Sequence, residues 1–151
     1  CTPGQIQRYM NKISGPLLDR IDIQCEISPV PFKDISKAAP GEPSARIRER
    51  VIRAREIQAE RFKDFKGIHC NAQMTERMIH QFAEPTEEGI NLLRMAMEKL
   101  SLSARAYNRI LKVARTIADL AGSQQVEPQH LAEAIGYRTL DRGDWAERGH
   151  F

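Results

Sequence analysis

The chain has 151 residues, of which 41% are hydrophobic and 28% charged, and its formal net charge is +3 with a sequence pI of about 8.9. This composition is typical of a globular domain with a mild preference for anionic partners, and no apolar run approaches the roughly 20 residues that a membrane-spanning helix needs. The three cysteines are odd in number and lack metal-type spacing, which argues against a disulfide framework and favours a reducing, cytoplasmic setting.

The first 30 residues combine a helix signal with a strand signal. Thr2-Pro3 is typical of an N-cap followed by proline at the first helical position, and predicts a short helix to about Ile13. Apolar and polar residues then alternate with a period of two over residues 21–27, which predicts a single strand. Because a lone strand needs partners, we expect its sheet to lie upstream, and we interpret the chain, which begins at Cys1 rather than Met, as a fragment.

Prolines and a glycine between residues 31 and 43 predict a linker and a domain boundary. Ser44 is then expected to cap a long helix that ends near Phe65. Eight basic and four acidic side chains lie between residues 46 and 66. The pattern alone favours a solvated helix with weak ion pairs, such as Glu49 with Arg53; the alternative is a surface that contacts nucleic-acid phosphates. The predicted buried face consists of Ile47, Val51, Ala54, Phe62 and Phe65.

The second half of the chain predicts a compact bundle of four or five helices joined by short loops. Thr75 is expected to cap one helix, Pro85-Thr86 to open another that runs through Leu100, and Pro128 to stand at the first position of the last. The predicted fold class is therefore mainly α, preceded by one helix and one strand. We divide the chain into residues 1–30, the linker 31–43, the bundle 44–140 and a tail at 141–151.

The most regular pattern lies between residues 101 and 122. The predicted apolar stripe consists of Ala106, Ile110, Val113, Ile117 and Leu120. Arg105, Arg109 and Lys112 follow the same spacing on a neighbouring stripe, and Gly122 stands where a left-handed C-cap would end the helix. A row of cations suits phosphate contact, whereas the pattern alone favours a solvated basic face. The chain contains no G-x-x-x-x-G-K-[ST] loop, so by itself it is expected to catalyse no hydrolysis.

Four segments carry a resemblance to a known family. They are CTPGQIQRYM with ISGPLLDRIDI within residues 1–23, SARIRERV at 44–51, LSARAYNRILKVARTIADL at 102–120 and HLAEAIGYR at 130–138. In this order they resemble the magnesium-chelatase-like AAA+ ATPases of the ComM/YifB type. The resemblance implies that residues 1–30 end an α/β ATPase core, that the bundle is its helical lid, and that the Walker motifs lie upstream.

The resemblance also implies roles for three arginines. The segment Leu-Leu-Asp-Arg gives Arg20 the role of an arginine finger that acts in trans on a neighbouring subunit. The segment Ser-x-Arg-Ala makes Arg105 the sensor 2 residue that contacts ATP phosphate, with Arg109 as a further cofactor contact. For Arg20 the alternative is an ion pair with Asp19 or Asp22, which the residues without the resemblance would favour.

The implied cofactors are ATP and Mg²⁺ in the full-length protein, with no tight binding expected for this chain alone. The implied partners are neighbouring subunits of a homo-oligomeric ring, expected to be hexameric, and single-stranded or branched DNA, with no membrane. The alternatives are an ATPase partner in metal chelation and an interaction module without chemistry of its own. Cys1 could belong to a zinc-type cluster that continues upstream, but one cysteine forms no site, and we assign no metal.

Overall fold

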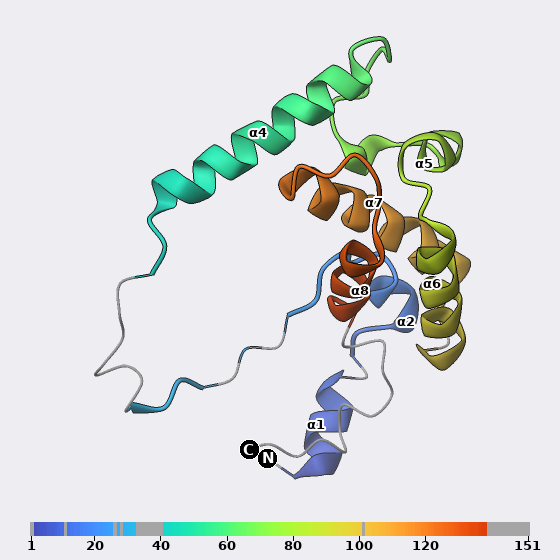
Figure 1. Cartoon of the computed structure of the whole chain (residues 1–151). Helices are drawn as coiled ribbons and strands as arrows, with labels where there is room; N and C mark the ends of the chain where they lie inside the picture. Colours follow the sequence, from blue (N-terminus) through green and yellow to red (C-terminus); the bar gives the residue numbers. More distant parts are fainter. Residues whose placement is uncertain are drawn as a thin grey trace.

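The computed structural model describes residues 2–10, 12–25, 27, 29–32, 41–100 and 102–138. These residues are mainly helical, which confirms the predicted fold class, and Figure 1 shows the course of the chain. The helices are α1 (Pro3–Met10), α2 (Gly15–Leu18), α4 (Ser44–Phe62), the short 3-10 helix η1 (Asn71–Gln73), α5 (Glu76–Phe82), α6 (Glu87–Leu100), α7 (Ala104–Leu120) and α8 (Pro128–Gly136).

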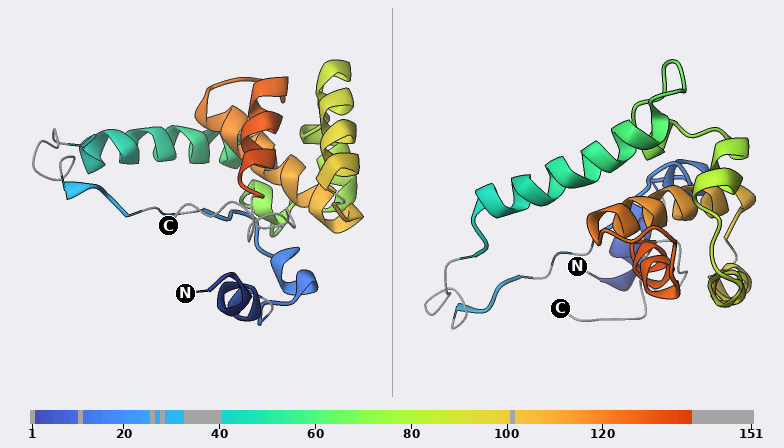
Figure 2. Two further views of the ribbon diagram at one scale, coloured as in Figure 1. Left: turned by 90° about the horizontal axis from the view of Figure 1, so that it is seen from below. Right: turned by 45° about the horizontal axis from the view of Figure 1, so that its top comes forward.

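Helix α7 is the centre of the bundle and contacts α4, η1, α5 and α8, while α6 packs against α8. The core between these helices is built from large apolar side chains: Phe62, Met78, Ile79, Leu93, Ile110, Leu111, Val126 and Leu131. Helix α1 lies outside the bundle in all the ribbon views (Figures 1 and 2). No helix in the described part of the chain is both long and apolar enough to cross a membrane.

Three predicted helix ends are confirmed in the bundle. The Thr75 side chain accepts a hydrogen bond from the Met78 N–H and so caps α5, and α8 begins at Pro128. Gly122 has a φ of 71°, the left-handed conformation expected just after α7. Local capping chemistry therefore predicted these ends because each depends only on residues close by in the sequence.

The buried face of α7 differs from the predicted stripe. Ala106 and Ile110 are buried as predicted, but Leu120 is 46% exposed and Val113 and Ile117 are only partly covered. The remaining buried positions are Leu111, Ala114, Arg115, Ala118 and Asp119. The shift arises because a basic and an acidic residue four positions apart pair with each other and can therefore be buried together.

Helix α4 packs against the bundle only through its second half. Ala54, Gln58 and Phe62 are buried, whereas Ile47 and Val51 are 44% and 41% exposed, so the predicted buried face is wrong for the first two turns. The first half of α4 projects away from the other helices (Figures 1 and 2). The helix ends at Phe62 rather than at Phe65, and its N-cap is Pro43 rather than Ser44.

The predicted strand at residues 21–27 is not formed among the described residues. This segment is irregular, and its Gln24 N–H donates a 2.8 Å hydrogen bond to the Tyr137 carbonyl instead of entering a ladder. Ile21, Ile23 and Ile27 are exposed. A strand requires a neighbouring strand, and the part of the chain that the structure describes offers none. Cys1, linker residues 33–40 and the predicted tail 141–151 lie outside the described residues.

Candidate functional site

Three segments that are distant in sequence meet at Asp19, the residue that follows α2. The Ser103 hydroxyl donates a 3.0 Å hydrogen bond to Asp19 Oδ2, and Ser103 Oγ also caps α7 by accepting from the Ala106 N–H at 3.2 Å. Arg138, which follows α8 and is 1% exposed, donates to the Ile21 carbonyl at 2.7 Å and lies 3.7 Å from Asp19 Oδ1. We call Asp19, Ser103 and Arg138 the Asp19 junction.

Arg20 lies beside this junction and is exposed. Within the described residues its side chain makes no hydrogen bond or ion pair. Asp19 bonds to Ser103 and pairs with Arg138, and Asp22 forms an ion pair with Arg109. The alternative of an ion pair between Arg20 and Asp19 or Asp22 is therefore not formed.

A groove of about 700 Å³ runs between α7 and the segment that follows Asp22. Its apolar wall consists of Ile23, Val113, Ile117 and Leu120, three of which belong to the stripe that was predicted to be buried. Its polar lining includes Asp22, Arg105, Arg109, Lys112, Glu133 and Tyr137. The groove thus joins the predicted sensor residue Arg105 to the end of α8.

The three cations of the predicted basic row have different surroundings. Arg109 is paired with Asp22, and Lys112 Nζ donates to the Ala72 carbonyl at 2.9 Å. Arg105, in the first turn of α7, is exposed and makes no hydrogen bond or ion pair with the described part of the chain. The structure therefore places Arg105 and Arg109 together on the groove, and of the three cations in this row only Arg105 lacks a partner within the described ranges.

Tyr137 contributes a titratable group to the groove. Its hydroxyl donates a 2.8 Å hydrogen bond to Glu133 Oε1, and this bond, together with the carboxylate charge, raises the pKa of Tyr137 above its ordinary value. No group of three or more His, Cys, Asp or Glu side chains that could hold a metal occurs in the described ranges. The groove thus combines three basic side chains, Arg105, Arg109 and Lys112, with the carboxylates of Asp22 and Glu133.

Sequence reasoning missed a buried polar network that joins α4 to α7. Arg61 on α4 bonds to both carboxylate oxygens of Asp119 at 2.7 and 2.5 Å and to Asn71 Oδ1 at 2.8 Å. Asn71 also donates to Asp119 and to Thr116. We call Arg61, Asn71, Arg115 and Asp119 the Asp119 network.

Arg115 completes the Asp119 network from within α7. Its guanidinium donates hydrogen bonds to Asp119 and to the carbonyls of Ser123 and Gln124. Arg115 therefore also holds the loop that follows α7 against the helix. Burial is the main cause that lowers the pKa of Arg115, and the charge of Asp119 opposes this shift. The sequence did contain one indication of this network: Arg115 and Asp119 are four residues apart, the spacing of a helical ion pair, and lie on the same helix face as Leu111 and Ala118.

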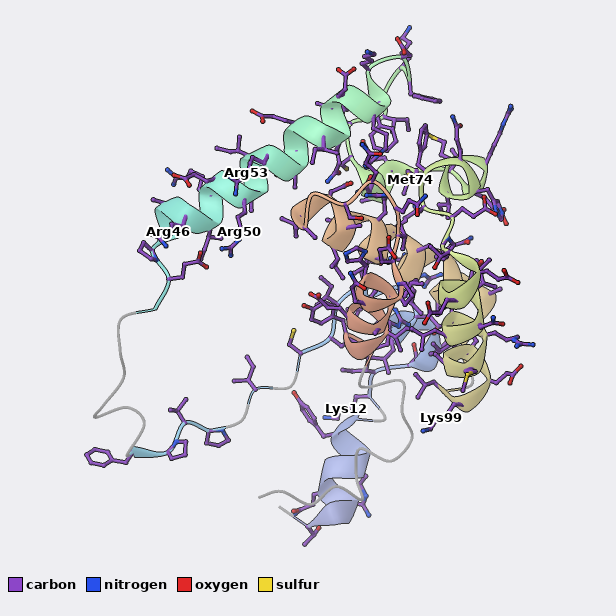
Figure 3. The ribbon with its side chains drawn as sticks, in the orientation of Figure 1. Lys12, Arg46, Arg50, Arg53, Met74 and Lys99 are labelled. Atoms are coloured by element: carbon purple, nitrogen blue, oxygen red, sulfur yellow. The ribbon has the colours of Figure 1, made fainter. Side chains whose placement is uncertain are left out.

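The basic surface predicted on α4 is smaller than its charge count implies. Arg61 is part of the Asp119 network, Lys63 pairs with Glu60, and Arg50 pairs with Glu42. Figure 3 shows Arg46, Arg50 and Arg53 on the projecting half of α4, far from Lys99. The exposed arginines of α4 without an ion pair to a described residue are Arg46, Arg48, Arg53 and Arg55.

Two magnesium chelatase family models and several curated relatives match this chain, and together they cover most of its length. The family model described as "Magnesium chelatase, subunit ChlI C-terminal" matches residues 41–138, and the one described as "Magnesium chelatase, subunit ChlI" matches residues 1–35. The chain is 44% identical to Competence protein ComM of Haemophilus influenzae over 142 residues, which cover 93% of the chain and 27% of that relative.

Two further relatives are proteins of uncharacterized function. YifB of Escherichia coli is 44% identical over 143 residues, which cover 94% of the chain and 27% of YifB. Rv2897c of Mycobacterium tuberculosis is 34% identical over 138 residues, which cover 91% of the chain and 27% of Rv2897c. The chain thus spans about a quarter of the length of the curated relatives that it matches. It belongs to the magnesium-chelatase-like AAA+ family of the ComM/YifB type.

Proposed function

We propose that this chain supplies Arg20 as a trans-acting arginine finger to a ring-shaped AAA+ ATPase. The observation that carries the proposal is that the Arg20 side chain is exposed while Asp19 and Asp22 are both engaged by other residues. A guanidinium is planar and permanently charged, so it stabilises the charge that spreads over the γ-phosphate oxygens during phosphoryl transfer. A finger from a neighbouring subunit makes hydrolysis depend on assembly of the ring.

Arg105 is the proposed sensor 2 residue, which contacts ATP phosphate. Its support is its exposed position in the first turn of α7, a helix of 17 residues whose N-terminal dipole also favours an anion. Arg109 stays in the proposal as a secondary contact, because Asp22 competes with phosphate for its charge.

The cofactor implied for the whole protein is ATP with Mg²⁺, which supplies the transferable phosphoryl group and the metal that neutralises it. The exposed cations fit the phosphate part of this pair. The sequence contains no G-x-x-x-x-G-K-[ST] loop, and we propose, as the family resemblance implies, that the phosphate-cradling loop and the Mg²⁺ ligands lie upstream of this chain. We accordingly expect this chain alone to bind ATP weakly or not at all.

DNA is the substrate that we propose for the ring. The exposed arginines on the projecting half of α4 suit contact with phosphates, and one relative bears the name Competence protein. The second candidate is a role in metal chelation, which the description of the family models favours. The two differ in what stimulates hydrolysis: DNA in the first case, and a porphyrin or partner subunit in the second.

The test is the steady-state ATPase rate of the full-length protein, with and without single-stranded DNA. Arg20→Ala should lower kcat by about three to five orders of magnitude, the contribution of an arginine finger. Activity should return when Arg20→Ala subunits are mixed with a Walker A variant that retains its own Arg20. Arg105→Ala should also reduce turnover. Unchanged turnover in both variants would contradict both assignments, and absent DNA stimulation would contradict the substrate.

A further inference from the structure

We propose that Asp19 and Ser103 are positioning residues that hold Arg20 and Arg105 in one fixed arrangement. The inference rests on the proposed function, since it concerns how two phosphate-directed arginines are presented together. Asp19 precedes Arg20 directly, and Ser103 stands two residues before Arg105. A single hydrogen bond of 3.0 Å between these residues therefore joins the two parts of the chain that carry the charges, across 84 positions of sequence.

The contacts of the Asp19 junction restrain the turn that carries Arg20. Helix α2 consists of only four residues, Gly15–Leu18, and none of them is buried, so packing restrains this turn little. Ser103 Oγ and the Arg138 guanidinium approach Asp19 from α7 and from the end of α8. Arg138 is itself buried and bonded to the Ile21 carbonyl, so it holds the chain on the other side of Arg20 as well.

Ser103 has two hydrogen bonds with different chemical requirements. As the N-cap of α7 its oxygen accepts from the Ala106 N–H at 3.2 Å, a role that serine, threonine, asparagine and aspartate all perform. Toward Asp19 its hydroxyl must donate, because a carboxylate only accepts. An aspartate at position 103 would keep the cap but would place a second carboxylate against Asp19, whereas an asparagine could both cap and donate.

This difference allows the positioning role to be separated from helix stability. Phosphoryl transfer depends on the placement of charges around the phosphate, and a displacement of about 1 Å can cost about 10²-fold in rate. A junction that acts on Arg20 and Arg105 should therefore change kcat much more than the stability of the fold. A merely structural hydrogen bond would change stability and leave kcat per folded ring unaltered.

The experiment compares Ser103→Asp with Ser103→Asn in the full-length protein, and measures kcat, KM for ATP and thermal unfolding. Ser103→Asp should lower kcat about 10²-fold, and Ser103→Asn should retain most of the activity. The double variant Ser103→Asp with Asp19→Asn should regain activity, since the new amide can donate to the new carboxylate. The matched control is Thr75→Asp, which adds a carboxylate at the N-cap of α5 and should leave kcat unchanged.

The outcomes separate this inference from the proposed function. If Arg20→Ala abolishes turnover but Ser103→Asp keeps kcat within about twofold of wild type, the junction has no positioning role and the arginine finger stands. A loss of kcat in Ser103→Asp that the second substitution does not rescue would also overturn the inference. If Arg20→Ala leaves turnover intact, the proposed function and this inference fail together.

Discussion

Arg61 on α4 donates two hydrogen bonds, of 2.7 and 2.5 Å, to the carboxylate of Asp119 at the end of α7, 58 positions later in the sequence. The Asp119 carboxylate is fully buried, and Arg115 approaches it from within the same helix. This contact fixes the projecting helix α4 to the helix that begins beside Arg105. In the proposed motor, a shift of α7 caused by the nucleotide would therefore move α4 as well.

Asp119→Ala should strongly destabilise the chain. The substitution leaves Arg61 and Arg115 without their common carboxylate, and removing one partner of a buried ion pair typically costs about 3 to 5 kcal/mol. The free energy of unfolding in urea, followed by helical circular dichroism, measures this loss. The control is Glu60→Ala, which breaks the exposed pair with Lys63 and should cost at most about 1 kcal/mol. Equal losses in the two variants would show that the Asp119 network contributes no more than a surface pair.

Gly89→Ala should also destabilise the bundle, although alanine favours helices. A Cβ atom at position 89 would lie 2.7 Å from Leu131 Cδ1 and 3.1 Å from Pro85 Cβ, so the Leu131 side chain, which is fully buried in the core, would have to move. Overpacking of this kind costs about 1 to 3 kcal/mol, more than the gain of about 1 kcal/mol in helix propensity. Gly136→Ala is the control, because no atom lies within 4 Å of its added Cβ. The free energy of unfolding in urea should be lower for Gly89→Ala than for the wild type. A higher value for Gly89→Ala would contradict the close contact of α6 with Leu131 and Pro85.

Local chemistry predicted the ends of the helices better than their buried faces. Thr75, Gly122 and Pro128 lie where capping and turn preferences place them, because these preferences act over a few residues. The apolar stripe of α7 was assigned incorrectly at Leu120, because hydrophobic periodicity counts Arg115 and Asp119 as polar and does not detect that they neutralise each other.

At the candidate site, too, contacts between residues that are distant in sequence could not be predicted. The resemblance pointed to Arg20 and Arg105, and their roles remain predictions. The hydrogen bond between Asp19 and Ser103 and the burial of Arg138 could not be predicted, since they depend on contacts across 84 or more positions. Spacing along one helix also could not reveal that Asp22, on another segment, neutralises Arg109.

Glu133→Gln should lower the pKa of Tyr137 toward the ordinary tyrosine value of about 10. Because the pKa of Tyr137 is higher in the folded chain than in the unfolded chain, its hydrogen bond to Glu133 contributes fully to stability at a pH below the unfolded-state pKa. This contribution is lost as the pH rises through the folded-state pKa. Alkaline titration of phenolate absorbance measures the shift, and Tyr137→Phe assigns the affected part of the titration curve to Tyr137. Identical titration curves for wild type and Glu133→Gln would contradict the hydrogen bond.

Replacing Arg46 and Arg53 together by glutamine should weaken binding of this chain to single-stranded DNA and make that binding less sensitive to salt. Both side chains are exposed on the projecting half of α4 and make no ion pair with a described residue. Each phosphate contact contributes about 0.7 to the slope of log affinity against log salt for a single strand, so two lost contacts should lower the slope by about 1.4. Fluorescence anisotropy of a labelled oligonucleotide measures both quantities. Lys99→Gln removes an exposed charge far from α4 (Figure 3) and should change neither. If the double variant binds like the wild type, α4 is not the DNA surface, and the DNA hypothesis loses its structural support.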